Sequence, residues 1–232
     1  MPAKARSEVR SKDGIVYVID GAGGSGFLPF VMRGILADSP WEMTHFRWSA
    51  GYMRIIKDLT NREANRIRAR ELSAQILARR EARPGDQIHV IAKSAGTAIA
   101  LWAMAELPER VVDRVILLAP AVSPGFPLEK SLRAARSDVY SFWSPRDLFF
   151  LGLGTSIFGT ADGVKGKSAG LVGFAQPQAL EYDADCAKMV EVEWNASMLS
   201  CWHVGDHAGT SMPPFIQRYV IPLLEKADNR TS

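Results

Sequence analysis

Short runs of consecutive apolar residues alternate along this chain with longer stretches in which apolar residues recur every three or four positions. The short runs are typical of strands buried on both faces of a sheet, and the longer stretches are typical of amphipathic helices. Six strands are predicted in this way, at 15–19, 43–48, 88–91, 111–118, 139–143 and 189–194. Helical patterns are found at 27–37, 60–83, 98–107, 128–135 and 215–224.

This alternation predicts an α/β fold, with a mostly parallel central sheet of about six strands and helices on both faces. Because no linker or internal repeat interrupts the pattern, we expect a single domain over residues 1–232, with a flexible N-terminus at 1–13. Right-handed crossovers place the C-terminal ends of all parallel strands at one edge of the sheet. The loop at 20–26, Ser94, Asp147 and the last loop with histidines should therefore meet at that edge.

The clearest predicted helix begins with Thr60-Asn61-Arg62-Glu63, which has the sequence of a capping box. A single apolar stripe is expected to face the sheet, made of Ala64, Ile67, Leu72 and Ile76. The other face is rich in Arg and Glu, which is typical of a solvated outer helix.

The composition, with 47% apolar and 23% charged residues, is that of a soluble globular protein. A formal net charge of +3 is too small to indicate a nucleic-acid partner. No apolar run approaches the ~20 residues of a membrane span, and residues 1–14 lack the apolar segment of a secretory signal. Cys186 and Cys201 are expected at opposite ends of a strand, so we predict no disulfide and a cytoplasmic location.

One strand runs directly into the turn Ala92-Lys93-Ser94-Ala95-Gly96, and a helical pattern starts at once. A Ser at the apex of a strand–turn–helix has its hydroxyl lifted above the sheet edge, beside the first N–H groups of the helix. Small residues at Ala92 and Gly96 allow the close backbone approach that such a turn requires. An ordinary turn in which Ser caps the helix would use the same residues.

In the order of its strands and helices, and in the order Ser, Asp, His, the chain resembles the α/β-hydrolase superfamily from Ile15 to the closing helix. The resemblance implies a serine hydrolase with Ser94 as nucleophile, an acid after a later strand and a His after the last strand. Ala92 stands in place of the first Gly of G-x-S-x-G, and Asp20-Gly21 stands where esterases often have His-Gly. The family's N-terminal strands are missing, and the short link between the fourth and fifth strands leaves no room for a cap domain.

The candidate acid is Asp147, which follows a strand in a turn that contains proline. It would orient the imidazole of the base, although the same residue could cap a helix that starts at Leu148. Asp183 and Asp206 are weaker candidates for the acid.

The chain contains four histidines. His45 and His89 fall in predicted strands and are expected to be core or edge residues. His207 lies in a turn between two glycines and is our preferred base, with His203 as the second candidate.

Backbone N–H groups of Ala95 and of Ala22 or Gly23 are the candidates for the oxyanion hole. The aromatic residues Trp48, Phe149 and Trp202, with the segment 148–174, are predicted to line the acyl pocket. The same aromatics could equally belong to the core.

Two other functions compete with the hydrolase. Residues 21–26 also satisfy G-x-G-x-x-G, which is typical of NAD(P)-binding oxidoreductases. However, residues 46–51 offer no carboxylate for the ribose, and no Tyr-x-x-x-Lys pair is present. Arg47 would suit a 2′-phosphate only poorly. A binding module that kept the hydrolase fold without turnover is the other possibility.

The sequence therefore predicts hydrolysis of a small-molecule carboxylic ester through an acyl-enzyme on Ser94, with no cofactor, no metal and no nucleic-acid partner. It does not specify the oligomeric state.

Overall fold

A six-stranded sheet forms the centre of the computed structural model, which describes residues 13–147, 159–175 and 189–226. The strands are β1 (Gly14–Ile19), β2 (Trp41–His45), β3 (Gln87–Lys93), β4 (Arg114–Leu118), β5 (Val139–Trp143) and β6 (Met189–Glu193). Their order is β2-β1-β3-β4-β5-β6, and every neighbouring pair is parallel. The predicted fold class is thus confirmed.

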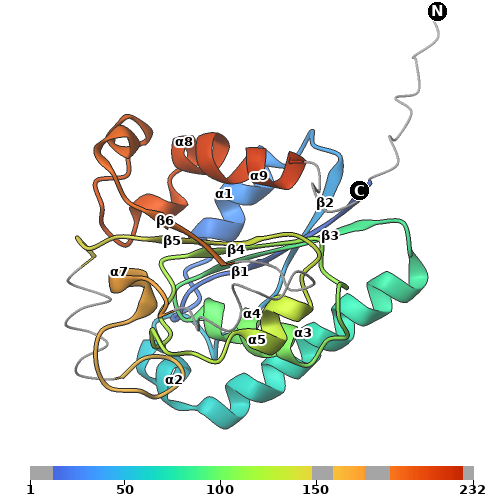
Figure 1. Ribbon diagram of the computed structural model, residues 1–232, viewed down its shortest axis with the longest axis horizontal. Helices are drawn as coiled ribbons and strands as arrows, with labels where there is room; N and C mark the ends of the chain where they lie inside the picture. The colour runs from blue at the N-terminus through green and yellow to red at the C-terminus, as the bar shows by residue number, and fades with distance from the viewer. Residues whose placement is uncertain (1–12, 148–158, 176–188, 227–232) are drawn as a thin grey trace, which may run out of the picture.

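Helices cover both faces of the sheet (Figure 1). On one face lie α1 (Phe27–Ile35), α8 (Pro213–Phe215), the π-helical turn η5 (Ile216–Val220) and α9 (Ile221–Glu225). On the other face lie α3 (Arg62–Ala82), α4 (Gly96–Ala105) and α5 (Glu129–Arg133). Only a connection with α5 joins β4 to β5, as expected for a fold without a cap at that position. No helix within the described ranges is both long and apolar enough to cross a membrane.

Each strand of the interior contributes to two apolar cores, because its side chains alternate between the two faces. In β1, Val16 and Val18 pack beneath α1 and the C-terminal helices. Ile15, Tyr17 and Ile19 face the other way, toward α3 and α4. This explains why β1 is apolar at consecutive positions.

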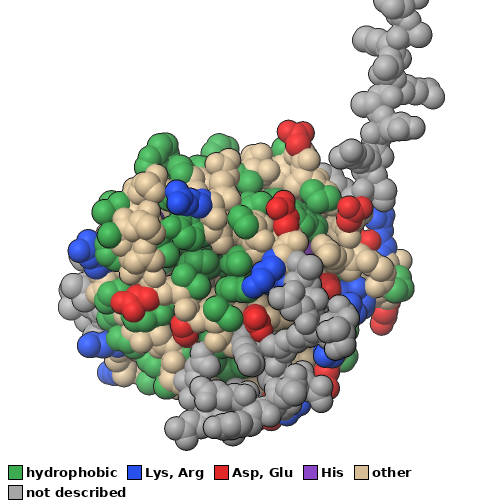
Figure 2. Space-filling model, turned by 45° about the horizontal axis from the view of Figure 1, so that its top comes forward, with side chains coloured by type: hydrophobic (Ala, Val, Ile, Leu, Met, Phe, Trp, Pro, Cys, Tyr) green, Lys and Arg blue, Asp and Glu red, His purple; other side chains and the backbone are tan. Residues whose placement is uncertain are grey.

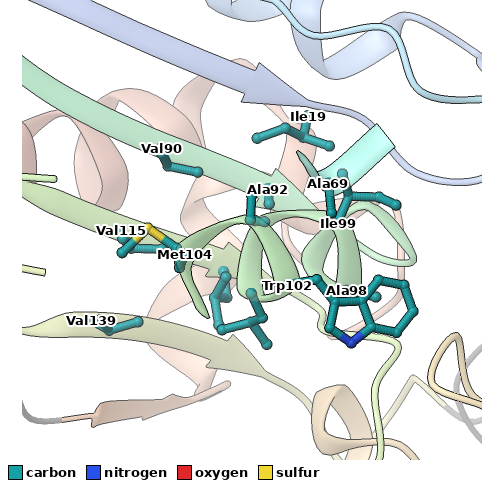
Figure 3. Packing of buried hydrophobic residues seen from close by; sticks show 14 of the residues in the cluster. Ile19, Ala69, Val90, Ala92, Ala98, Ile99, Trp102, Met104, Val115 and Val139 are labelled. Atoms are coloured by element: carbon teal, nitrogen blue, oxygen red, sulfur yellow. The ribbon is translucent and has the colours of Figure 1, made fainter. Parts of the chain in front are cut away.

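Helix α4 is the most deeply buried helix, with every residue from Gly96 to Met104 inside the core. Small side chains at the interface let it lie close to the sheet: Ala92 of β3 and Ala98 of α4 belong to the same apolar cluster (Figure 3). At its first residue, a methyl group on Gly96 would lie 2.3 Å from the Asp20 carbonyl oxygen. The start of α4 therefore rests directly on the end of β1.

The start of α3 differs from the prediction. Thr60 is the last residue of an additional helix, α2 (Ile55–Thr60), and its hydroxyl donates to the Ile56 carbonyl oxygen at 2.7 Å. Asn61 caps α3 instead, accepting a hydrogen bond from the Ala64 N–H at 3.2 Å. The capping box predicted at Thr60 was wrong because α2 occupies that residue.

The buried stripe of α3 also differs in part from the prediction. Leu72 and Ile76 are buried as expected, whereas Ile67 is 50% exposed. At 100° per residue, Ile67 is rotated by about 140° from Leu72, but Ala69 and Asn65 lie on the same side as Leu72. The stripe therefore continues through Ala69 and Asn65, both of which are buried.

The second strand ends earlier than predicted, at His45 rather than at residue 48. Its register is set by Gly14, which pairs with Trp41. Consequently His45 lies at the C-terminal edge of the sheet, and Arg47 and Trp48 belong to the loop beyond it.

The contact between α4 and β1 predicts a large effect of one methyl group. Gly96→Ala should lower the free energy of unfolding by about 1–3 kcal/mol, because the new Cβ would overlap the Asp20 carbonyl. Gly34→Ala in α1 is the control, because a Cβ there meets nothing within 4 Å. That control should leave stability unchanged or raise it by about 0.5–1 kcal/mol. Urea unfolding measures both, and equal effects would contradict the packing described.

Candidate active site

Ser94 connects β3 to α4 in a left-handed backbone conformation, with φ of 51°. A residue with a Cβ is strained there by roughly 1–3 kcal/mol, and such strain persists only where the surroundings enforce it. Several hydrogen bonds do so, including one from the Thr97 hydroxyl to the Ser94 carbonyl at 2.6 Å. The Ser94 N–H donates to the Leu118 carbonyl at 2.9 Å, and the Ser94 carbonyl accepts from the N–H groups of Thr97 at 3.0 Å and Ala121 at 3.2 Å. The serine is thus held at the apex of the turn, partly open to solvent.

The loop after β1 lies against this serine. A methyl group on Gly21 would be 3.2 Å from Ser94 Cβ and 3.7 Å from Ser94 Oγ. Gly96 meets the end of the same strand, as described above. Because Gly21 and Gly96 have no side chains, the backbone of this loop and that of the turn at Ser94 can approach each other closely.

Asp147 and His207 form a close pair two strands away from Ser94. Asp147 follows β5 and is 3% exposed, and its Oδ2 lies 2.7 Å from His207 Nδ1. In this geometry the carboxylate accepts the Nδ1–H, which fixes the tautomer and leaves Nε2 as the basic nitrogen. The chemistry available to the pair is therefore proton acceptance at Nε2.

The loop that carries His207 is anchored at several points. The Ser144 hydroxyl donates to the Gly205 carbonyl oxygen at 2.7 Å, which joins the end of β5 to this loop. The Gly209 N–H donates to Asp206 Oδ1 at 2.9 Å. Asp206, a weaker candidate for the acid, is thus used within the loop, and Asp183 lies outside the described residues.

His203 is packed underneath the same loop. It is 2% exposed, its ring meets Phe215 edge-on with centroids 4.9 Å apart, and its carbonyl accepts from the Trp194 indole N–H at 2.9 Å. A methyl group on Gly209 would overlap its imidazole. Burial lowers the pKa of His203 to about 4, so the ring is neutral at pH 7. The structure places it as a packing residue of the core.

The two remaining histidines lie in strands, as predicted. His89 in β3 is 2% exposed, and neither ring nitrogen has a hydrogen-bond partner among the described residues. Burial lowers the pKa of His89 to about 4. His45, at the end of β2, is half-buried; burial and then the charge of Arg47 lower its pKa.

Lys93, next to Ser94, is a buried lysine that the sequence analysis did not single out. Its Nζ donates to the Ser211 hydroxyl at 2.5 Å, and Ser211 belongs to the 3₁₀ turn η4 (Gly209–Ser211) just after His207. Burial lowers the pKa of Lys93, opposed by the carboxylates of Asp20, Asp147 and Asp206. This side chain thus links β3 directly to the segment that carries His207.

The candidate oxyanion donors differ in their availability. Ala95 is the residue before α4, where the first N–H groups have no partner within the helix. The Gly23 N–H, however, donates to Asp58 Oδ2 at 2.8 Å. Gly23 is therefore engaged, and Ala22 is the remaining candidate from this loop.

The same hydrogen bonds bear on the dinucleotide-binding motif. In that motif the backbone of the glycine-rich loop approaches a pyrophosphate. Here the Gly21 N–H donates to Asp20 Oδ1 at 2.9 Å, and the Gly23 N–H is held by Asp58. Two of the loop's N–H donors are thus occupied by carboxylates of the protein, Asp20 and Asp58, which disfavours the NAD(P) hypothesis.

Asp58 is the second residue that the sequence analysis missed. It lies in α2 and is 2% exposed. Its carboxylate accepts from the Ser49 hydroxyl at 2.6 Å and the Ala50 N–H at 2.7 Å, in addition to Gly23. It therefore joins the loop after β1 to the loop after β2.

A cavity of about 330 Å³ opens beside Ser94, between these two loops. It is bounded by Asp20, Gly21, Gly24, Gly26, Pro29, Phe30, Arg33, His45, Arg47, Trp48, Ser49, Gly51 and Tyr52. Ser94 is not among these residues, but Gly21 belongs both to this wall and to the surroundings of Ser94.

The predicted substrate-binding aromatics have different positions. Trp48 is 5% exposed, lines the cavity and donates its indole N–H to the Asp20 carbonyl at 2.8 Å. Trp202 is 66% exposed and does not line the cavity. Phe149 lies outside the described residues.

Exposed apolar residues surround this part of the molecule. Phe27 and Phe30 of α1 are 42% and 74% exposed, and Leu199 and Val204 near His207 are 48% and 55% exposed. Figure 2 shows many apolar side chains on the face formed by α1 and the C-terminal helices. Among the described residues, no group of three His, Cys, Asp or Glu side chains could hold a metal ion.

Comparison with known proteins identifies the fold. No family model matches the sequence, and no curated protein sequence matches it either. Among solved structures, a predicted CIB-like hydrolase from Thermoplasma acidophilum is similar with a TM-score of 0.50 and 12% identity, over 94% of this chain and 90% of that one. LpqC, a poly(3-hydroxybutyrate) depolymerase from Bordetella parapertussis, is similar with a TM-score of 0.51 and 13% identity, over 86% and 77%. The chain has the α/β-hydrolase fold.

The buried neutral histidines predict acid sensitivity. Because the folded protein keeps His89 neutral down to about pH 4 while the unfolded chain takes up its proton near pH 6.5, stability should be lost as the pH falls from 6.5 toward 4. His89→Leu should remove a part of this loss, on the order of 2 kcal/mol at pH 5. Urea unfolding at pH 7 and pH 5 measures it; an unchanged pH dependence in the variant would contradict the assignment.

Proposed function

We propose that this protein is a serine hydrolase that cleaves carboxylic esters through an acyl-enzyme on Ser94, with His207 as general base and Asp147 as its orienting acid. The observation that carries the proposal is the pairing of an enforced left-handed Ser94 with the Asp147–His207 contact of 2.7 Å at the same edge of the sheet.

The spacing of the strands supports this assignment. β3 and β5 are separated by β4, so Ser94 and Asp147 start about 10 Å apart, at two strand spacings. The imidazole of His207, hydrogen-bonded to Asp147 on one side and to Ser94 on the other, would span such a distance. The Lys93–Ser211 hydrogen bond holds the histidine segment toward β3, on the side where this line would close.

In the proposed reaction, His207 Nε2 accepts the Ser94 Oγ proton as Oγ attacks the ester carbonyl carbon. The negative charge that develops on the carbonyl oxygen is stabilised by the N–H groups of Ala95 and Ala22. The intermediate then collapses, and the imidazolium returns the proton to the leaving alcohol. Water, deprotonated by His207, attacks the acyl-enzyme and releases the acid and the free Ser94 hydroxyl.

The similar structures also favour hydrolysis over nucleotide chemistry. One is described as a hydrolase and the other as a depolymerase of poly(3-hydroxybutyrate). Ester cleavage is the reaction for which Ser94, His207 and Asp147 are arranged in our proposal.

The nucleophile is tested by Ser94→Ala. This change should reduce hydrolysis of p-nitrophenyl butyrate by about 10⁴–10⁶-fold, because no other group forms the acyl-enzyme. The mass increase after incubation with a fluorophosphonate should disappear as well. Ser200→Ala, at an exposed serine, is the matched control and should keep both. Labelling of the wild-type protein at another residue, or no labelling, would contradict the proposal and favour a binding module.

The base is tested by comparing the two late histidines. His207→Ala should remove both turnover and fluorophosphonate labelling, since no other imidazole lies beside Asp147 in our assignment. His203→Asn should lower stability but retain most of the labelling, because His203 acts in packing. Thermal unfolding of both variants separates the effects. The opposite pattern would transfer the role of base to His203.

A further inference from the structure

Two cationic side chains line the cavity beside Ser94. Arg33 comes from α1, and Arg47 comes from the loop after β2. Among the described residues, neither guanidinium forms a hydrogen bond or an ion pair. The charges of both arginines also lower the pKa of His45, which lines the same cavity. The two positive charges therefore act on the same part of the cavity.

Asp20 is the carboxylate in the cavity wall, and both of its oxygens accept hydrogen bonds within the loop. Its Oδ1 accepts from the Gly21 N–H at 2.9 Å, and its Oδ2 accepts from the Ser25 hydroxyl at 3.0 Å. It is also 5% exposed, whereas both arginines are exposed. With one negative and two positive groups, the cavity favours an anionic guest.

The rest of the cavity is suited to the apolar part of a bound molecule. Phe30 and Tyr52, 74% and 77% exposed, present aromatic rings there, and Trp48 contributes to the wall. A volume of about 330 Å³ lies at the small end of the range for ligand sites, about 300–1,000 Å³. The guest would thus combine a short apolar chain with an anionic group.

The direction of the reaction determines which part of the ester enters the cavity. The leaving oxygen must receive its proton from His207, so the alcohol lies toward β5 and the histidine loop. The cavity lies on the opposite side of Ser94, next to β1 and β2. The acyl part is therefore the part that reaches it.

We infer that this cavity binds the acyl part of the substrate and that Arg33 and Arg47 bind an anionic group, a carboxylate or a phosphate, at the end of that acyl chain. The inference rests on the proposed function. It defines the substrate class as esters of an acid with a second, negatively charged end.

The test compares esters that differ only in that end. Mono-p-nitrophenyl adipate carries a terminal carboxylate where p-nitrophenyl hexanoate carries a methyl group, and p-nitrophenyl 5-phosphonopentanoate carries a phosphonate. The wild-type protein should have a higher kcat/KM for one or both anionic esters than for hexanoate. The better anionic ester distinguishes a carboxylate from a phosphate as the natural group, and added salt should reduce the preference.

Variants locate the preference. Arg33→Gln and Arg47→Gln should each lower kcat/KM for the preferred anionic ester about tenfold, the loss expected for one charge-assisted hydrogen bond. Each should change hexanoate hydrolysis less than threefold. Lys130→Gln, at an exposed lysine on α5, is the control for a general loss of positive charge and should change neither.

The outcomes separate the two proposals. Hydrolysis of hexanoate without preference for an anionic ester, or a preference unchanged in both arginine variants, would overturn the acyl-anion site and leave the hydrolase standing. No hydrolysis of any ester and no fluorophosphonate labelling would overturn the proposed function, and this inference with it.

Discussion

The close approach of three backbone segments is the constraint on which the candidate site depends. The end of β1, the apex at Ser94 and the first residue of α4 share a space in which a single methyl group at Gly96 would overlap the Asp20 carbonyl. A left-handed Ser94 is the conformation that lets β3 turn into α4 within this space. Hydrogen bonds with Leu118 and Ala121 hold Ser94 in this strained conformation, so β4 and the loop after it stabilise the strained backbone. The position of the hydroxyl is thus a property of three strands together.

Asp58 extends this arrangement to the cavity. Its carboxylate holds Gly23 after β1 and Ser49 and Ala50 after β2, and its own carbonyl accepts from Asn65 of α3 at 2.6 Å. A buried carboxylate that accepts three hydrogen bonds keeps both loops in one geometry. The wall that faces Ser94 and the wall that bears Arg47 are therefore positioned by the same residue. Pre-organisation of this kind matters in an active site, because misplacement by about 1 Å can cost 10²-fold in rate.

The sequence predicted the fold, because strand runs and crossover handedness are local or general rules. The structure contains the Asp147–His207 contact at 2.7 Å, and the contact of His207 with Ser94 stays a prediction. The sequence did not predict the hydrogen bonds from Gly23 to Asp58 and from Lys93 to Ser211, whose partners lie 35 and 118 residues apart in the chain. The capping box predicted at Thr60 was wrong for a related reason. Thr60 ends the short helix α2, and Asp58 in that helix accepts a hydrogen bond from the distant Gly23. Likewise Trp202, expected in the pocket as a large aromatic residue, is exposed; residue size alone does not distinguish a pocket from a surface.

The electrostatic balance around Lys93 completes the physical account of the site. Burial lowers the pKa of Lys93, and three carboxylates, Asp20, Asp147 and Asp206, oppose that effect from three different loops. The Lys93 Nζ also donates to the Ser211 hydroxyl, which ties β3 to the segment that follows His207. Because Lys93 directly precedes Ser94, one short sequence supplies both the left-handed serine and a hydrogen bond to the histidine segment.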